Sequence, residues 1–285
     1  PNRLRVDVTT VPPPIEHCVR HPHVATGRHC TRCGRPACND CLVQATVGSH
    51  CLDCVRAAQP PRAERMRRWN ATQPAFVTRA LIGLNVAVFL WTGTGGASAL
   101  GGGNASLRQS DLAIARYFLR QGEWWRVVTA GFLHFGILHI AMNMLLLYQL
   151  GNLLEPVVGR GRFAILYLAS LVGGSCGAVL LSPNALTGGA SGAVFGLMGA
   201  ASVALLHRGV NPMHTGIGTT LVLNLLITFA IPGISVGGHL GGVLVGAGVG
   251  YVMFDPAVNR QSRWLTWVAP VAAIVACALA LRAAV

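Results

Sequence analysis

The chain has 285 residues, of which 52% are apolar and 11% are charged, whereas ordinary soluble domains are about a quarter charged. This composition excludes an ordinary soluble globular protein. All 22 basic residues are Arg, so chemistry that needs a lysine, such as a Schiff base or a Ser–Lys dyad, is excluded as well.

The N-terminal segment, residues 1–17, contains Val11-Pro12-Pro13-Pro14 and shows no apolar periodicity, which is typical of a disordered lead-in. The first apolar run long enough for a secretory signal begins near Ala75, after the cysteine-rich segment. We therefore expect the cysteines to stay in the cytosol, where metal binding is favoured over disulfides.

Residues 18–54 hold seven of the nine cysteines, arranged with one histidine in four pairs that are each spaced by two residues. Eight such ligands suit two tetrahedral zinc sites. The segment has almost no large apolar residues, so bound metal must supply its folding energy. The pairs can combine consecutively, or the first with the third and the second with the fourth. The predicted ligands are Cys18, His21, Cys30, Cys33, Cys38, Cys41, Cys51 and Cys54.

Residues 55–75 form a basic linker that includes Arg62, Arg65 and Trp69. This pattern predicts a juxtamembrane segment, with Arg near anionic headgroups and Trp at the interface; a solvated charged helix is the alternative. Residues 1–72 carry 11 Arg against 5 acidic residues, but residues 1–68 contain no aromatic residue. Base stacking is therefore excluded, and we do not expect a nucleic-acid partner.

Seven apolar stretches follow, each close to the roughly 20 residues that a helix needs to cross a bilayer. The sequence therefore predicts an all-α polytopic membrane protein, with a six-helix core over 76–254 and a linker and seventh helix over 255–285. The fourth, fifth and seventh stretches are short for a span. None of the seven stretches contains an acidic residue. The stretches are 76–94, 127–150, 163–181, 189–206, 215–231, 236–254 and 264–282.

Arg residues indicate the orientation. With the N-terminus inside, the cytoplasmic segments after residue 55 carry nine of the Arg residues that flank the spans, and the outer segments carry five. The positive-inside rule then predicts an N-terminus in the cytoplasm and a C-terminus outside, in the plasma membrane. Residues 95–126 become an outer loop, and Trp124 and Trp125 place its end at the membrane interface.

Several polar residues lie within the apolar stretches, where each needs a partner or a water-filled cavity. His139 and Asn143 are four residues apart and share one helical face. Such a pair can hydrogen-bond a neighbouring helix, or it can donate to an oxyanion. For Asn224 we expect only a hydrogen bond to a neighbouring helix.

Ser191 lies in Gly189-Ala190-Ser191-Gly192, at the expected start of the fourth span. There its hydroxyl can act as a helix cap or a packing group, or it can be a nucleophile beside unpaired backbone N–H groups. His239 begins the sixth span from the same side. Both spans carry small residues at intervals of about one turn, so their backbones can come close: Gly192, Gly196 and Ala200 on the fourth, Gly242, Gly246 and Gly250 on the sixth.

A serine and a histidine that meet in this way provide a nucleophile and a base. The orienting carboxylate of a triad is missing from the spans. The sequence therefore predicts a dyad, with the imidazole positioned by packing and backbone groups.

Four separated motifs occur in the order found in rhomboid intramembrane serine proteases, which residues 76–254 resemble: Trp125-Arg126, His139-x-x-x-Asn143, Gly189-Ala190-Ser191-Gly192 and Gly238-His239-x-x-Gly242-x-x-x-Gly246. The resemblance implies that Ser191 is the nucleophile and His239 the general base. It also implies an oxyanion hole formed by the Ser191 N–H, His139 and Asn143.

The same resemblance implies that Gly189 shapes the hole and that His134 lies near the cavity. Phe195 stands where some members have Tyr, and it can still stack on the catalytic imidazole. The fifth span and residues 232–236 would form the lateral gate and lid. The cysteine segment is similar to B-box-like zinc modules, which implies a cytosolic protein partner.

We therefore predict an intramembrane serine endopeptidase that cleaves transmembrane segments of membrane protein substrates within the bilayer. The alternative is a catalytically inactive relative that binds and traffics membrane proteins. A transporter would need charged or ion-coordinating groups within its spans, and the apolar stretches carry no charged residue away from their ends.

Overall fold

The computed structural model describes residues 14–61, 64–65, 75–93 and 107–285. Most of the predicted lead-in, Trp69 with most of the basic linker, and the glycine-rich start of the outer loop lie outside the described residues. The chain divides into two compact units, Pro1–Trp69 and Asn70–Val285.

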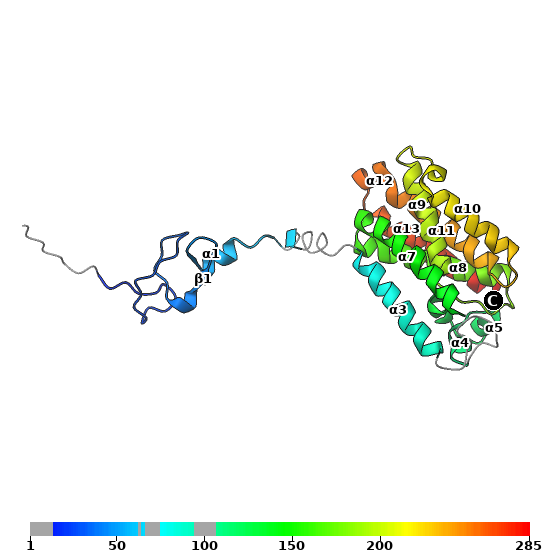
Figure 1. The fold of residues 1–285 in the computed structure, drawn as a ribbon, viewed down its shortest axis with the longest axis horizontal. Helices are drawn as coiled ribbons and strands as arrows, with labels where there is room; N and C mark the ends of the chain where they lie inside the picture. The colour runs from blue at the N-terminus through cyan, green and yellow to red at the C-terminus, as the bar shows by residue number, and fades with distance from the viewer. Residues whose placement is uncertain (1–13, 62–63, 66–74, 94–106) are drawn as a thin grey trace, which may run out of the picture. The chain divides into compact units, whose positions relative to one another are not determined.

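The first unit contains little regular structure (Figure 1). A short 3-10 helix, η1 (Asn39–Cys41), leads into the antiparallel strands β1 (Leu42–Gln44) and β2 (Ser49–Cys51), and helix α1 (Leu52–Ala57) follows directly. Its buried apolar cluster consists of five cysteines and one alanine among the described residues. Large side chains contribute little to this core, so the fold depends on what the cysteines bind.

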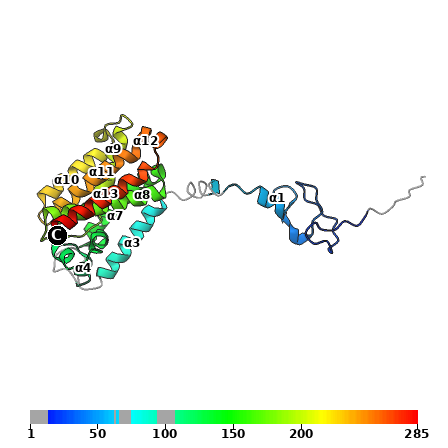
Figure 2. The ribbon, with the colours of Figure 1, turned by 180° about the vertical axis from the view of Figure 1, so that it is seen from behind.

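The second unit is a helical bundle (Figures 1 and 2). Five of its helices are long and apolar enough to cross a membrane, and α9 and α10 are shorter apolar helices of 16 and 14 residues. The predicted all-α polytopic fold is thereby confirmed. Its elements are α3 (Phe76–Gly93), α4 (Leu107–Leu112), α5 (Arg116–Arg120), α6 (Arg126–Thr129), η2 (Ala130–Phe132), α7 (Ile137–Val158), α8 (Arg160–Leu181), α9 (Ser191–Leu206), η3 (Pro212–Thr215), α10 (Ile217–Ala230), α11 (Val236–Phe254), α12 (Pro256–Gln261) and α13 (Leu265–Ala284).

Two predicted span boundaries are wrong. The second spanning helix begins at Ile137 rather than at residue 127, because Arg126–Thr129 and Ala130–Phe132 form separate short helices before it. It also continues to Val158, beyond the predicted end at residue 150. The seventh helix has 20 residues and is not short.

The extension of α7 brings an acidic residue into the bundle. Glu155 is 2% exposed and accepts hydrogen bonds from the backbone N–H groups of Val77 and Thr78 and from the Thr78 hydroxyl. These N–H groups belong to the first turn of α3 and have no partner within that helix. The carboxylate therefore caps α3 and ties it to α7, which the sequence pattern did not predict.

Helices α9 and α11 pack backbone to backbone, as the small-residue pattern predicts. A Cβ atom on Gly242 would lie 2.0 Å from the Gly192 carbonyl oxygen, and one on Gly246 would lie 2.1 Å from the Gly196 carbonyl oxygen. Helix α8 joins them through Gly177, where a Cβ atom would lie 2.2 Å from the Gly237 carbonyl oxygen. No side chain fits at these contacts, so the register between the three helices is fixed.

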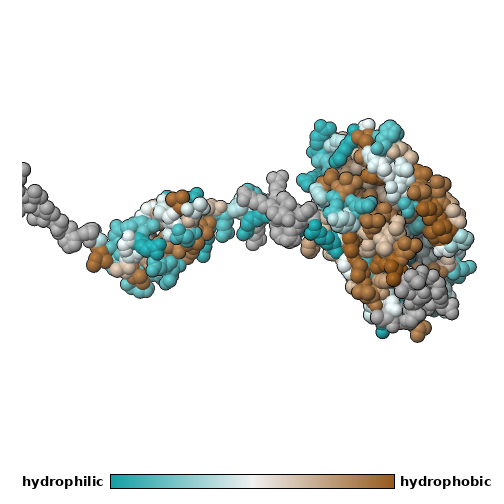
Figure 3. All heavy atoms as spheres, viewed as in Figure 1, coloured by the Kyte–Doolittle hydropathy of each residue, from teal (hydrophilic) through white to brown (hydrophobic). Residues whose placement is uncertain are grey.

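Large apolar side chains cover much of the outside of the bundle, as the brown surface in Figure 3 shows. On α10, for example, Leu226 and Phe229 are 61% and 62% exposed. Apolar surface of this extent suits contact with lipid rather than with water.

Candidate active site

Ser191 is the first residue of α9 and lies two residues after Gly189, which has a positive φ. Gly189 has φ +145°, a conformation that residues with a side chain rarely adopt. A Cβ atom there would lie 3.0 Å from His139 Nε2 and 3.5 Å from Ser191 Oγ. The lack of a side chain at Gly189 therefore leaves the space beside the Ser191 hydroxyl and the His139 ring open. Ser191 remains partly exposed, while the residues that follow it are buried.

His239 lies in the first turn of α11 and is 7% exposed. The Ser235 hydroxyl caps this helix by accepting from the Gly238 N–H at 3.1 Å. The ring of Phe195 stacks on the imidazole, with centroids 3.9 Å and planes 15° apart. Phe195 and Ser191 are one turn apart and share a face of α9, so the serine face is the one turned toward His239.

Thr228 of α10 also contacts His239, and the sequence pattern does not predict this contact. Its Oγ1 lies 2.6 Å from His239 Nδ1, and the side chain is 2% exposed. The only signal in the sequence is the spacing of Asn224 and Thr228, which places two polar residues on one face of an apolar helix. The Asn224 side chain donates from Nδ2 to the Thr220 carbonyl within α10 at 2.8 Å.

The predicted oxyanion donors lie at the start of α7. Asn143 is 6% exposed and donates from Nδ2 to the His139 carbonyl at 2.9 Å. The second hydrogen of this amide is not used by that bond. His134 is fully buried and packs edge-on against the His139 ring, with centroids 5.0 Å apart. The two ring nitrogens of His134 have no hydrogen-bond partner among the described residues.

A buried arginine organises the segment before α7. Arg126 is 5% exposed, and its Nη1 donates to the carbonyl groups of Ser110 and Ala113 at 2.5 and 2.8 Å. Its guanidinium also bonds to Glu123 at 2.5 Å and lies 3.8 Å from the centre of the Phe118 ring. The segment that Arg126 holds together continues into η2, where the Ala130 carbonyl accepts a hydrogen bond from the Gly189 N–H at 2.8 Å. The loop thus fixes the glycine beside Ser191.

The eight predicted metal ligands gather into two clusters in the first unit. Within each cluster the ligand atoms all lie within 4.8 Å of one another. The pairs combine first with third and second with fourth, which settles the alternative that spacing left open. The clusters are Cys18, His21, Cys38 and Cys41, and Cys30, Cys33, Cys51 and Cys54.

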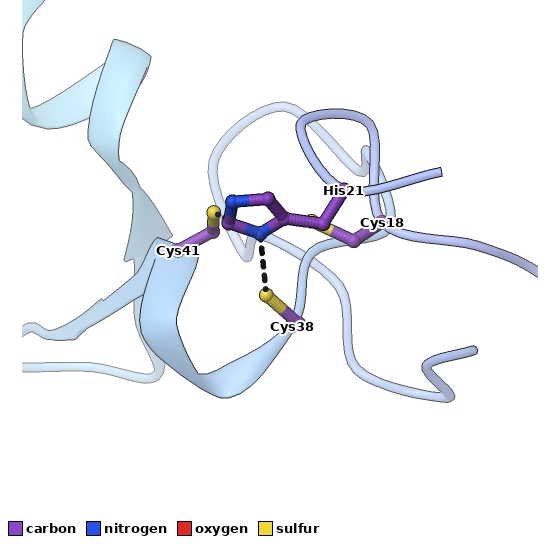
Figure 4. Close-up of side chains that lie close together, drawn as sticks. All are labelled: Cys18, His21, Cys38 and Cys41. Atoms are coloured by element: carbon purple, nitrogen blue, oxygen red, sulfur yellow. Dashed lines mark hydrogen bonds between the residues drawn. The ribbon is translucent and has the colours of Figure 1, made fainter. Parts of the chain in front are cut away.

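In the first cluster the imidazole points its Nδ1 at the sulfurs (Figure 4). His21 Nδ1 lies 3.3 Å from Cys38 Sγ and 3.5 Å from Cys41 Sγ. This ring nitrogen is therefore the one placed to share a metal ion with the thiolates.

Backbone N–H groups favour the thiolate form of one cysteine in each cluster. For Cys18, a hydrogen bond from the Cys38 backbone is the main cause that lowers its pKa to about 6. For Cys30, burial raises the pKa of the thiol, but hydrogen bonds from backbone N–H groups outweigh burial and lower this pKa to about 5. The main donor is the Cys51 N–H, whose nitrogen lies 3.1 Å from Cys30 Sγ. Thiolates are the form that binds metal. Each cluster thus contains a cysteine whose thiolate form is favoured, and the convergence of its four ligand atoms means that it could hold a metal ion.

The helical unit is similar in sequence to known proteins. The Rhomboid domain family matches residues 121–256. The chain is 41% identical over 131 residues to "Rhomboid protease GluP" of Bacillus subtilis, covering 45% of this chain and 26% of that protein. It is 33% identical over 176 residues to "Rhomboid-like protease 1" of Toxoplasma gondii, covering 58% of each chain. It is 31% identical over 179 residues to "Rhomboid-related protein 2" of Mus musculus, covering 56% of this chain and 58% of the mouse protein.

The fold and the match together define a multi-pass membrane protein with a rhomboid domain. Residues 121–256 of the chain match the Rhomboid domain family, as the motifs predict. It spans about a quarter to three fifths of the length of these curated relatives.

Proposed function

We propose that this protein is an intramembrane serine endopeptidase that cleaves transmembrane segments of membrane protein substrates through a dyad of Ser191 and His239. One observation carries the proposal: the face of α9 that begins with Ser191 presents Phe195 to the His239 ring, and a side chain at Gly189 would contact both the His139 ring and the Ser191 hydroxyl. The relatives named as proteases support the same activity.

In the proposed reaction, Ser191 Oγ attacks the scissile carbonyl carbon and its proton passes to His239 Nε2. The carbonyl oxygen becomes an oxyanion that accepts from the Ser191 N–H, His139 and Asn143. The C–N bond then breaks and His239 returns the proton to the leaving amine. Water hydrolyses the remaining acyl ester with the same imidazole as base.

The test uses detergent-purified protein, a single-span substrate and a serine-directed fluorophosphonate. We expect wild-type protein to cleave the substrate and to be labelled at Ser191, as found by peptide mass spectrometry. Ser191→Ala and His239→Ala should lose both reactions. Ser202→Ala is the matched control, because Ser202 lies on the same helix and bonds only to the Met198 carbonyl in the described contacts.

An inactive relative that binds and traffics membrane proteins is the second candidate. It would bind the substrate without cleaving it, and Ser191 would not be labelled. That result would overturn the proposed activity. The presence of both Ser191 and His239 favours the enzyme.

We also propose that the two cysteine clusters hold structural Zn²⁺ in Cys₃His and Cys₄ sites, since four ligands of these types at one point suit tetrahedral zinc. All ligand positions are then filled, so the module serves binding rather than catalysis. We propose a cytosolic protein as its partner and a plasma-membrane location with the N-terminus inside, which the arginine distribution supports.

A further inference from the structure

The proposed base has a hydrogen-bond partner on a helix other than its own. Thr228 Oγ1 on α10 lies 2.6 Å from Nδ1 of His239 on α11. Both side chains are buried, at 2% and 7% exposure. Among the described residues Glu155 is the only buried carboxylate, and it is bonded to α3. The hydroxyl therefore occupies the position that a carboxylate takes in a triad.

A second contact of Thr228 determines the direction of this hydrogen bond. Its Oγ1 also lies 2.7 Å from the Asn224 carbonyl oxygen. Two oxygens this close need a proton between them, and a carbonyl has none to donate. The single hydroxyl proton therefore points at Asn224, and a lone pair of Oγ1 faces the imidazole.

It follows that His239 donates from Nδ1 and that Nε2 carries no proton in the neutral ring. We propose that Thr228 is a positioning residue that holds His239 in this tautomer, with Nε2 free to accept the Ser191 proton. The inference rests on the proposed function for its role in catalysis. Phe195 sets the plane of the ring by stacking on it, and Thr228 sets the rotation within that plane.

The burial pattern of α10 supports a specific role for this residue. Only Gly218 and Thr228 are buried on this 14-residue helix, whose other side chains are partly or fully exposed. The Asn224 amide is itself fixed by its bond to the Thr220 carbonyl. Thr228 is thus the one buried side chain of α10 with a polar atom, and it is aimed at the imidazole.

The activity test compares three variants of the full chain in detergent. Thr228→Val keeps the shape but removes the hydroxyl, and we expect kcat and the rate of Ser191 phosphonylation to fall about tenfold with KM unchanged. Thr228→Ser keeps the hydroxyl and should retain most activity. Thr220→Val makes the same change on the same helix, two turns away, and should behave as wild type.

Equal loss in Thr228→Val and Thr228→Ser would assign the effect to packing and overturn the proposal. Full activity of Thr228→Val would overturn it as well. If wild-type protein neither cleaves nor reacts with phosphonate, the proposed protease function fails, and a second measurement still decides about Thr228.

That measurement is ¹⁵N NMR of histidine-labelled protein, with His239 assigned by its absence in His239→Gln. We expect the Nδ1–H tautomer in wild type and in Thr228→Ser, and a shift toward Nε2–H in Thr228→Val. An Nε2–H tautomer in wild type would overturn the proposal whatever the activity.

Discussion

The Phe195 ring lies nearly parallel to the His239 imidazole, on the same face of α9 that begins with Ser191. Aromatic pairs contribute about 0.5–1.5 kcal/mol beyond the area they bury. We therefore expect Phe195→Leu to lower kcat by about 2- to 10-fold, because the His239 ring, which we propose accepts the serine proton, loses the ring stacked on it. Phe195→Tyr keeps the stacking and should retain activity. Steady-state peptidase kinetics check this, and an unchanged kcat in Phe195→Leu would show that stacking does not orient the base.

Asn143 has one amide hydrogen that its bond to the His139 carbonyl does not use. If that hydrogen donates to the oxyanion, Asn143→Ala should lower kcat by about 10²- to 10³-fold with KM little changed. Asn152 makes the same type of bond, to the Tyr148 carbonyl on the same helix, and Asn152→Ala is the matched control. A fully active Asn143→Ala enzyme would remove Asn143 from the oxyanion hole.

The contact between α9 and α11 predicts a strong difference between two glycines of α11. A methyl group on Gly242 would lie 2.0 Å from the Gly192 carbonyl oxygen, whereas one on Gly248 would meet nothing within 4 Å. Gly242→Ala should lower the free energy of unfolding by about 1–3 kcal/mol or prevent folding. Gly248→Ala should leave it unchanged or raise it by up to about 1 kcal/mol, since alanine favours helix. Thermal unfolding in detergent measures both, and similar melting temperatures would contradict the close packing.

Metal analysis tests the two clusters. We expect two Zn²⁺ per chain by mass spectrometry of the metal content, fewer in Cys30→Ser, and two again in Cys277→Ser, whose cysteine lies in the helical unit. A metal content of zero in wild type would contradict both sites.

Chelation should unfold residues 18–54 while Ser191 still reacts with phosphonate, because the proposed dyad contains no metal ligand. Limited proteolysis and phosphonate labelling follow the two effects separately. An immediate loss of peptidase activity that added zinc reverses would instead show that the metal module controls the active site.

The sequence predicts the helices and the close approach of α9 and α11 because both depend on patterns within single segments. It does not predict Thr228, since the contact with His239 depends on how α10 is rotated against α11. The sequence does not predict the role of Glu155 for a different reason: hydropathy declines after Leu150, although the backbone stays helical to Val158. Ligand spacing likewise fits either pairing of the cysteines, and only the fold separates them.

The alternating order of the metal ligands along the chain couples the metal occupancy of the two sites. The chain from His21 to Cys38 carries Cys30 and Cys33 of the other cluster, and the chain from Cys33 to Cys51 carries Cys38 and Cys41. In the proposed two-zinc module, each ion would therefore close the loop that presents half of its neighbour's ligands. Losing one ion releases that loop, so the module should fill and empty in an all-or-none manner as metal supply changes.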